Sequence, residues 1–187
     1  MSKIAFLVDQ MFEDSEFRVP YDRLLAAGHD IDIVGLQAGR EVIGKHREER
    51  VTIEKSVREV SEKHYDALVI PGGYSPDHLR MNRDAVSFTR AMAGANKPVA
   101  AVCHGPSMLI EAELTDDRLV TSWPSIKTDL INACARWVDR EVVVDGNLIT
   151  SRRPDDLPAF SDAILHQLAD GVPERREPMV EQQPTAG

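Results

Sequence analysis

Short apolar runs alternate along the chain with longer segments in which apolar residues recur at helical spacing. The runs lie at residues 4–8, 31–36, 67–70 and 99–102. Apolar runs of this length are typical of strands that are covered on both sides. They therefore predict the main strands of a buried sheet.

The segments between these runs predict helices. In residues 14–27, apolar side chains such as Phe17 and Leu24 fall on one face, and Gly28 is placed to end the helix. Strands and helices that alternate in this way predict an α/β fold with a mostly parallel sheet and helices on both of its faces. The other predicted helices cover residues 82–93, 106–113, 125–136 and 154–168.

Three segments depart from this alternation. Residues 41–57 are polar and mixed, and we interpret them as a small hairpin. Asp145 and Gly146 stand between two apolar runs, which is a strong signal for a second hairpin. Residues 171–187 are rich in Pro, Glu, Gln and Arg, and they cannot bury enough apolar surface to offset the entropy of ordering. The sequence therefore predicts one domain over residues 1–170, followed by a disordered tail.

The composition is ordinary for a globular protein, but the charge is not neutral. Of 187 residues, 42% are apolar and 28% are charged, and the formal net charge is −9. This charge argues against binding to nucleic acid or to an anionic membrane, because phosphates would be repelled. No apolar run approaches the roughly 20 residues that span a bilayer, and Asp9 interrupts the first run too early for a signal peptide. We expect a cytoplasmic protein.

Cys103 follows the run at 99–102, at the edge where open α/β sheets place their ligand sites. Gly105 and Pro106 come next, and proline suits the first turn of a helix. The chain therefore turns sharply from strand to helix at Cys103. Such a turn exposes the side chain, and the helix start lowers a thiol pKa below its usual value of about 8.5. We expect a thiolate nucleophile; the alternative is a buried structural cysteine.

Two neighbours of this turn could assist the thiolate. At a sharp turn, His104 can face the same cleft as Cys103, so it is the candidate base. Gly72 and Gly73 end the run at 67–70 at the same edge of the sheet, where a glycine lets a backbone N–H approach a substrate oxygen closely. One of these N–H groups, with that of His104, could form an oxyanion hole. An ordinary turn is the simpler interpretation of the two glycines.

Glu13 follows the first strand and lies at this edge too. A carboxyl group in a partly apolar cleft has a raised pKa. If Glu13 points at Cys103, it would hold a proton and donate a hydrogen bond to the sulfur. The alternative is a helix cap, a role for which Asp14 is well placed.

The remaining reactive side chains predict no second site. Cys134 stands among small residues in the predicted helix 125–136, and we interpret it as a core or interface thiol. The six histidines are scattered, with no His-x-x-x-His or Cys-x-x-Cys spacing, and the glycines form no phosphate loop. We therefore expect neither a metal nor another cofactor.

Together these motifs resemble one known family. The stretch Ala101-Val102-Cys103-His104-Gly105-Pro106, with Pro71-Gly72-Gly73 before it and Phe12-Glu13-Asp14 near the start, resembles the PfpI-type intracellular proteases. These belong to the ThiJ/PfpI, class I glutamine amidotransferase-like superfamily. The similarity extends over residues 3–170, and residues 155–160 look especially like bacterial general stress proteins of this family.

The resemblance implies a flavodoxin-like three-layer α/β sandwich. It also implies that Cys103 is the nucleophile, His104 its basic partner and Glu13 the carboxyl that bonds the thiol. In PfpI-like homo-oligomers an acid from a neighbouring subunit orients the histidine, and the matching residue here is Asp77, where the archaeal protease pattern has glutamate. Trp123 matches an aromatic position at the border of the pocket.

Members of this family are described as intracellular peptidases and as glyoxalases or deglycases that act on methylglyoxal-modified groups. The resemblance therefore implies a stress-related cysteine hydrolase, self-associated as a homodimer or larger homo-oligomer, with a peptide or small carbonyl substrate. The alternative is a non-enzymatic redox sensor or holdase chaperone in which Cys103 is oxidised. Turnover separates the two, because an enzyme needs His104 and the oxyanion donors, whereas a sensor needs only the thiol and its carboxyl partner.

Overall fold

The computed structural model describes residues 1–175, which form an α/β fold around one seven-stranded sheet. The strand order is β10-β11-β7-β6-β1-β2-β5, and all neighbours are parallel except β10 and β11. All four strands predicted from the apolar runs are present. The strands of this sheet are β1 (Lys3–Leu7), β2 (Asp30–Gly35), β5 (Lys55–Ser56), β6 (Ala67–Ile70), β7 (Val99–Val102), β10 (Val142–Asp145) and β11 (Leu148–Ser151).

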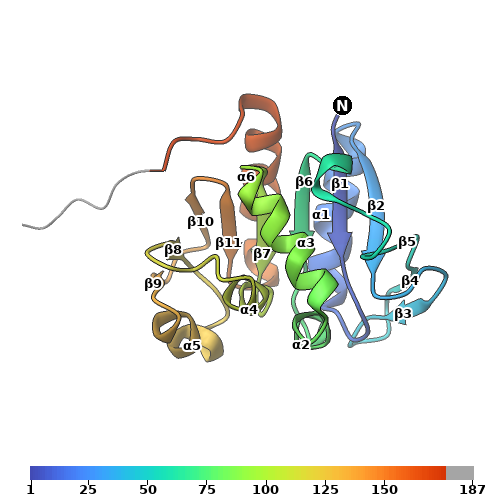
Figure 1. The fold of residues 1–187 in the computed structure, drawn as a ribbon, viewed down its shortest axis with the longest axis horizontal. Coiled ribbons are helices and arrows are strands. Elements are labelled where there is room, and N and C mark those ends of the chain that lie inside the picture. Colours follow the sequence, from blue (N-terminus) through green and yellow to red (C-terminus); the bar gives the residue numbers. More distant parts are fainter. Residues whose placement is uncertain (176–187) are drawn as a thin grey trace, which may run out of the picture.

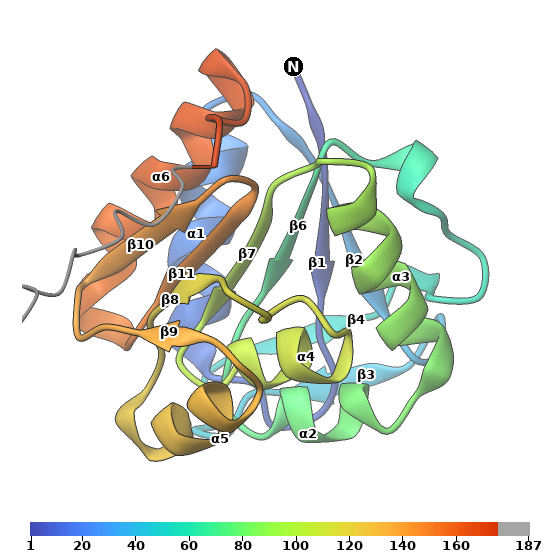
Figure 2. The same ribbon diagram turned by 60° about the vertical axis from the view of Figure 1, so that its left-hand side comes forward.

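Helices cover both faces of the sheet. Helices α1 and α6 lie against one face and α3 and α4 against the other (Figures 1 and 2). This arrangement confirms the predicted flavodoxin-like sandwich. The helices are α1 (Asp14–Ala26), α2 (Ser75–Arg80), α3 (Arg83–Gly94), α4 (Pro106–Glu111), α5 (Lys127–Asn132) and α6 (Leu157–Asp170).

Side chains of the central strands alternate between two hydrophobic cores. In β1, Ile4 and Phe6 belong to the core under α1 and α6, whereas Ala5 and Leu7 belong to the core under α3 and α4. Full burial of each large apolar side chain stabilises the fold by about 1.5–3 kcal/mol relative to exposure. The helices contribute Phe17, Leu24, Phe160 and Ile164 to the first core and Phe88, Met92, Met108 and Leu109 to the second.

Two smaller sheets flank the main one. β3 (Glu41–Ile43) and β4 (Arg50–Thr52) are antiparallel and form the hairpin predicted in residues 41–57, but the end of that range joins the main sheet as β5. The second predicted hairpin joins β10 to β11 through Gly146, whose φ of 57° suits a glycine. The sequence did not predict α2 or the short parallel pair β8 (Leu119–Val120) and β9 (Arg136–Trp137).

The predicted helix over residues 125–136 is too long. A 3-10 turn (Pro124–Ile126) leads into α5, which ends at Asn132. Cys134 then has a φ of 63°, and the Ala135 N–H donates to the Leu130 carbonyl at 2.9 Å. This is a Schellman ending, in which Cys134 occupies the left-handed position that usually holds glycine. Its thiol is exposed, so the expected core position is wrong.

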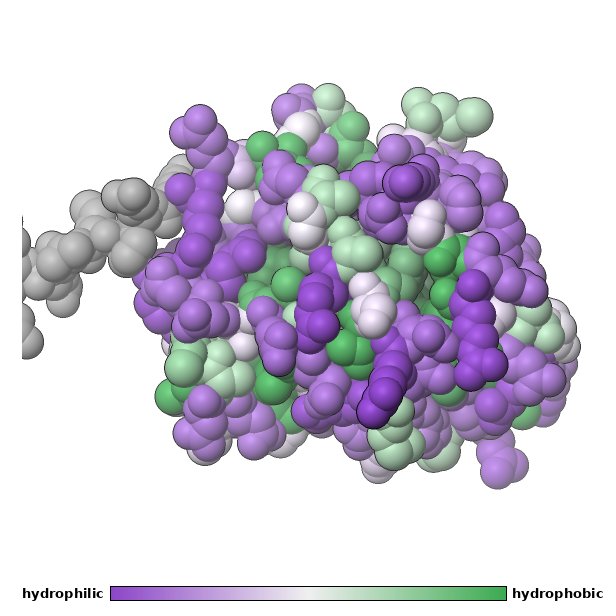
Figure 3. All heavy atoms as spheres, viewed as in Figure 1, coloured by the Kyte–Doolittle hydropathy of each residue, from purple (hydrophilic) through white to green (hydrophobic). Residues whose placement is uncertain are grey.

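The surface over α3 is mostly hydrophilic. Figure 3 shows apolar side chains on this face in small groups between charged ones. Among the helices of residues 1–175, none is long and apolar enough to cross a bilayer.

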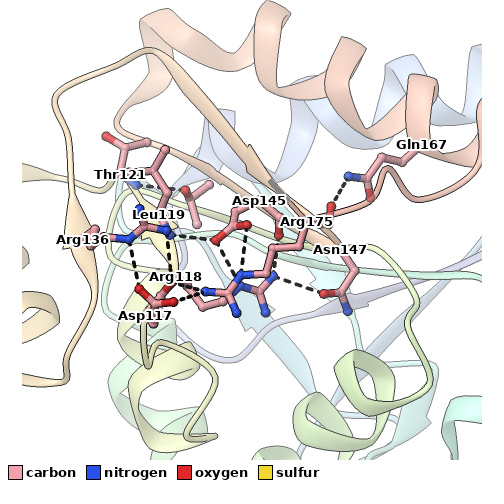
Figure 4. A network of polar contacts seen from close by, with 11 residues as sticks. Asp117, Arg118, Leu119, Thr121, Arg136, Asp145, Asn147, Gln167 and Arg175 are labelled. Carbon is pink, nitrogen blue, oxygen red and sulfur yellow. Dashed lines mark hydrogen bonds and ion pairs between the residues drawn. The ribbon is translucent and has the colours of Figure 1, made fainter. Parts of the chain in front are cut away.

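A network of polar side chains lies at the amino-terminal ends of the parallel strands, around the turn between β10 and β11 (Figure 4). The buried Asp145 carboxylate accepts hydrogen bonds from Arg118 Nε at 3.2 Å and from the Leu119 N–H at 2.8 Å. Arg175 pairs with Asp145 at 3.5 Å and with Asp117 at 2.9 Å. Residues 171–175 form no helix or strand, and the rest of the predicted tail, residues 176–187, lies outside the described residues.

Substitutions of Asp145 and of Arg175 in this network should lower the free energy of unfolding by different amounts. Asp145→Ala should lower the free energy of unfolding by about 3 kcal/mol, because it leaves the largely buried Arg118 guanidinium without its carboxylate. Arg175→Ala, the matched control on the exposed side, should cost less than about 1 kcal/mol. Denaturant titration of both variants measures the difference. Equally small losses of unfolding free energy in the two variants would show that Asp145 does not stabilise this edge of the sheet.

Candidate active site

The chain turns sharply at Cys103, as the sequence predicted. Cys103 directly follows β7 and has a φ of 62°, a conformation that few non-glycine residues adopt. Its N–H donates to the Ser151 carbonyl at 3.0 Å, and its carbonyl accepts from the Trp123 N–H at 2.9 Å. A Cβ on Gly105 would come within 2.6 Å of the Ile70 carbonyl, so the turn also requires a glycine there. Backbone held in this way at the end of a strand is typical of functional sites.

His104 contacts the thiol of its neighbour. Its Nδ1 lies 3.3 Å from Cys103 Sγ, and its Nε2 lies 3.3 Å from Ser125 Oγ. Burial lowers the pKa of His104, although the charge of Asp77 raises it in part. The imidazole is therefore neutral at neutral pH and can accept a proton from the thiol.

The two glycines after β6 have different roles. Gly73 has a φ of 74°, and a Cβ there would come within 2.5 Å of the Met11 carbonyl. The Gly72 N–H donates to Glu16 Oε2 at 2.9 Å, so Gly72 is not a free oxyanion donor. Among residues 1–175, the Gly73 N–H has no acceptor, which leaves it as the candidate donor on this side.

The carboxyl that the structure places beside the thiol is Glu16, whereas Glu13, the residue expected from the sequence, pairs with a lysine. Glu13 Oε2 pairs with Lys45 Nζ at 2.5 Å, and its Oε1 accepts from Ser15 Oγ at 3.3 Å. Glu16, one helical turn later, is fully buried. A Cβ on Gly72 would lie 2.6 Å from Glu16 Oε2 and 2.8 Å from Cys103 Cβ. The Glu16 carboxyl and the Cys103 side chain therefore both pack against Gly72.

A signal for Glu16 was present in the sequence. Glu16, Pro20 and Leu24 follow each other at a spacing of four, and all three are buried in α1. A glutamate in an otherwise apolar helical stripe is a buried carboxyl. The motif Phe12-Glu13-Asp14 predicted the carboxyl at the start of the helix, and the buried stripe that contains Glu16 was not considered.

Glu16 holds a proton at neutral pH. Burial raises its pKa to about 8, and the charge of Glu13 adds to this, against the lowering effect of the Gly72 N–H and of Cys103. Glu16 Oε1 is buried and has no hydrogen-bond partner among the described residues. A protonated carboxyl in this place can donate to a sulfur anion, which is the role that the sequence analysis gave to Glu13.

The predicted lowering of the Cys103 pKa is wrong for this single chain. Burial raises the pKa of the thiol, and a charge on Glu16 raises it further. The N–H of His104 and the charge of Lys45 act in the opposite direction. Helix α4 has only six residues, so its dipole is weak, whereas the cysteine is only 7% exposed. Ionisation of the thiol therefore depends on Glu16 keeping its proton.

Asp77 and Trp123 lie around this centre. Asp77 is exposed in the first turn of α2 and does not cap that helix. Its charge acts on His104, but the nearest hydrogen-bonding partner of the imidazole Nε2 is Ser125. Trp123 is joined to Cys103 through the backbone, and its side chain is 38% exposed. Both residues thus lie near the turn, with Trp123 at its exposed side.

Residues 2–167 match the model of the DJ-1/PfpI family. The chain belongs to the DJ-1/PfpI family. It is 48% identical over 167 residues to protein/nucleic acid deglycase 2 of Escherichia coli (strain K12), which covers 89% of this chain and 97% of the relative. It is 45% identical over 160 residues to general stress protein 18 of Bacillus subtilis (strain 168), with coverage of 85% and 94%.

A solved structure of the DJ-1/PfpI type agrees with this fold. The two-domain protein of Anabaena variabilis that contains DJ-1/ThiJ/PfpI-like and ferritin-like domains superposes with a TM-score of 0.89 at 38% identity. The superposition covers 95% of this chain and 52% of the Anabaena chain. The present chain therefore matches about half of that protein.

One group of side chains in this family member has metal-like spacing, but its oxygens are already bonded. Glu13, Asp14 and His46 place ligand atoms within 4.8 Å of one another. However, Lys45 pairs with Glu13, and the Asp14 carboxylate accepts three backbone N–H groups. We assign no metal to this group.

Replacing Glu16 tests its protonation. In Glu16→Gln, the thiolate should form at a pH about one unit higher, because an O–H bond to the anion worth about 1.5–3 kcal/mol gives way to a weaker amide bond. Ultraviolet absorbance of the thiolate against pH, with Cys103→Ala as the blank, measures this shift. A thiolate that forms at lower pH in Glu16→Gln would mean that Glu16 is ionised and repels the sulfur.

Proposed function

We propose that this DJ-1/PfpI family member is a cysteine hydrolase that releases an amine from a carbonyl-derived adduct or an amide. The observation that carries the proposal is the position of the Cys103 thiol, between the neutral His104 imidazole at 3.3 Å and the protonated carboxyl of Glu16. The names of the relatives support a deglycase activity and a role in stress. The substrate class is therefore a methylglyoxal-modified amine or a peptide.

The chemistry begins with proton transfer from the thiol to His104 Nδ1. With an amide substrate, the thiolate attacks the carbonyl carbon and forms a C–S bond, and the carbonyl oxygen takes the π electron pair of the C=O bond near the Gly73 N–H. The C–N bond then breaks, and the His104 imidazolium gives its proton to the leaving amine. Water that His104 deprotonates then cleaves the thioester and restores the thiol.

With a methylglyoxal carbinolamine, the C–S bond forms as the C–N bond breaks and the amine takes the imidazolium proton. The resulting hemithioacetal then loses its hydroxyl proton to the sulfur by way of His104, which breaks the C–S bond and releases the carbonyl compound and the thiol.

Burial of the thiol favours an enzyme over a redox sensor. Oxidation proceeds from an exposed thiolate, whereas Cys103 is 7% exposed and burial raises its pKa. The enzyme hypothesis is therefore the first to test.

Substitution of the two cysteines tests this proposal. Cys103→Ser should lower turnover of a methylglyoxal-modified amino acid or a fluorogenic peptide by at least about 10³-fold, because the nucleophile is lost. Cys134→Ser, the matched control at an exposed thiol, should stay within about threefold of the unmodified protein. His104→Ala should lose turnover as well. Measurable turnover by Cys103→Ser on the same substrate would contradict the proposal.

We also propose that the protein self-associates and that Asp77 acts across the subunit boundary. Asp77 is exposed and lines an open hollow of about 910 Å³ between α2, α3 and α4. A second copy of the chain that covers this hollow would bring the carboxylate toward the partner's imidazole. A carboxylate that accepts a histidine N–H fixes the tautomer and stabilises the imidazolium.

Mixed oligomers test the role of Asp77. Cys103→Ala and Asp77→Ala should each be inactive alone, and refolding them together should restore part of the activity. In the hybrid, one subunit supplies Cys103 and His104 and the other supplies Asp77. Full activity of Asp77→Ala alone, or no recovery in verified hybrids, would remove Asp77 from the site.

A further inference from the structure

The loop between β3 and β4 reaches over the start of α1 and brings a lysine to the active site. The Lys45 N–H donates to the Phe12 carbonyl at 2.8 Å, which ties the loop to the segment just before α1. The Lys45 side chain then turns to Glu13, with Nζ and Oε2 2.5 Å apart. Its side chain is 32% exposed, whereas that of Glu13 is 8% exposed. The ion pair is therefore partly shielded from water.

The loop is fixed by the carboxylate of Asp14. This carboxylate accepts the N–H groups of His46, Glu48 and Glu49 at 2.8, 3.0 and 2.8 Å. A Cβ on Gly44 would come within 2.1 Å of Asp14 Oδ1, so the loop packs directly on this carboxylate. Burial alone would raise the pKa of Asp14, but the three N–H groups hold it below its usual value. The fold thus sets the position of Lys45 before any substrate binds.

Lys45 faces an excess of negative charge. Glu13 and Glu16 lie three residues apart at the start of α1, and the charge of Glu13 raises the pKa of Glu16. Because Glu16 keeps its proton at neutral pH, a thiolate at Cys103 would be a second negative group beside Glu13. On the other sides, His104 contacts the sulfur, Asp77 acts on His104 from α2, and His46 Nε2 lies 3.5 Å from Glu13. Lys45 is the lysine of the described residues that acts on Cys103 and Glu16.

We propose that Lys45 is a positioning residue that holds Glu13 in an ion pair and so keeps the charge of Glu13 from opposing the Cys103 thiolate. This inference rests on the proposed function, in which that thiolate is the nucleophile. It assigns distinct roles to the two carboxyls: Glu13 is the partner of a cation, and Glu16 is the proton holder. The bonds of Lys45 to Glu13 also raise the lysine pKa despite its burial, so the cation persists at neutral pH.

A pair of variants separates this role from a direct effect on the sulfur. Lys45→Met removes the lysine partner of Glu13, so the charge of Glu13 should oppose the Cys103 thiolate. Alkylation of Cys103 by iodoacetamide at neutral pH should therefore slow by about tenfold. The double variant Lys45→Met with Glu13→Gln removes both charges and should return the rate to within about threefold of the unmodified protein. Lys45→Arg keeps a cation and should also restore most of the rate. Lys63→Met, an exposed lysine in a 3-10 turn (Glu62–His64), controls for the loss of one positive charge elsewhere.

The double variant distinguishes an effect of Lys45 through Glu13 from a direct effect of Lys45 on the thiolate. If it reacts as slowly as Lys45→Met alone, the lysine acts on the thiolate itself and the proposed role is overturned. An unchanged alkylation rate in Lys45→Met also overturns it. If Lys45→Met does not fold, Lys45→Arg and the double variant still test the proposal. Because arginine keeps a cation beside Glu13, slow alkylation of Cys103 in folded Lys45→Arg together with fast alkylation in the double variant would contradict the proposal.

Alkylation reports the thiolate without a substrate. A dependence of the rate on Lys45 would therefore stand even if the protein turned over neither a modified amine nor a peptide, a result that would refute the proposed function alone.

Discussion

The proposed nucleophile, Cys103, is a buried thiol that must still ionise, and the rest of the site depends on this requirement. Desolvation disfavours the anion of Cys103, so nearby groups have to compensate. The structure provides compensation of three kinds: a base at Nδ1 of His104, a carboxyl that keeps its own proton at Glu16, and a lysine, Lys45, that pairs with the charge of Glu13. The glycine at Gly72 is part of this solution, since only a residue without a side chain lets the carboxyl and the cysteine approach.

The sheet brings these groups together from distant parts of the sequence. Cys103 follows β7, the two glycines follow β6, and α1 begins soon after β1, so all lie at the carboxyl ends of three neighbouring parallel strands. The hairpin of β3 and β4 adds the lysine from outside the main sheet. The strands need only be buried and correctly ordered, and the chemistry is supplied by the residues that follow them.

Sequence patterns predicted the sheet and the turn at Cys103, but not the contacts inside the site. Apolar runs identify buried strands because both faces are covered, and Gly105-Pro106 identifies the turn. The choice between Glu13 and Glu16 depends on helical phase at the first turn of α1, where a shift of three residues moves a carboxyl from the lysine to the sulfur. The end of α5 was missed because Cys134 takes a left-handed conformation that sequence rules reserve for glycine. β8 and β9 have only two residues each, too few to form a pattern.

Ionisation of Cys103 depends most on the Glu16 carboxyl, which is protonated beside the thiol at neutral pH. Infrared difference spectroscopy of the unmodified protein against Glu16→Gln measures this directly, because a protonated carboxyl has a C=O stretching band distinct from that of a carboxylate. We expect a protonated-carboxyl band at neutral pH that disappears in Glu16→Gln and persists in Cys134→Ser. A carboxylate band for Glu16 at neutral pH would instead show that Glu16 is ionised and opposes the thiolate of Cys103.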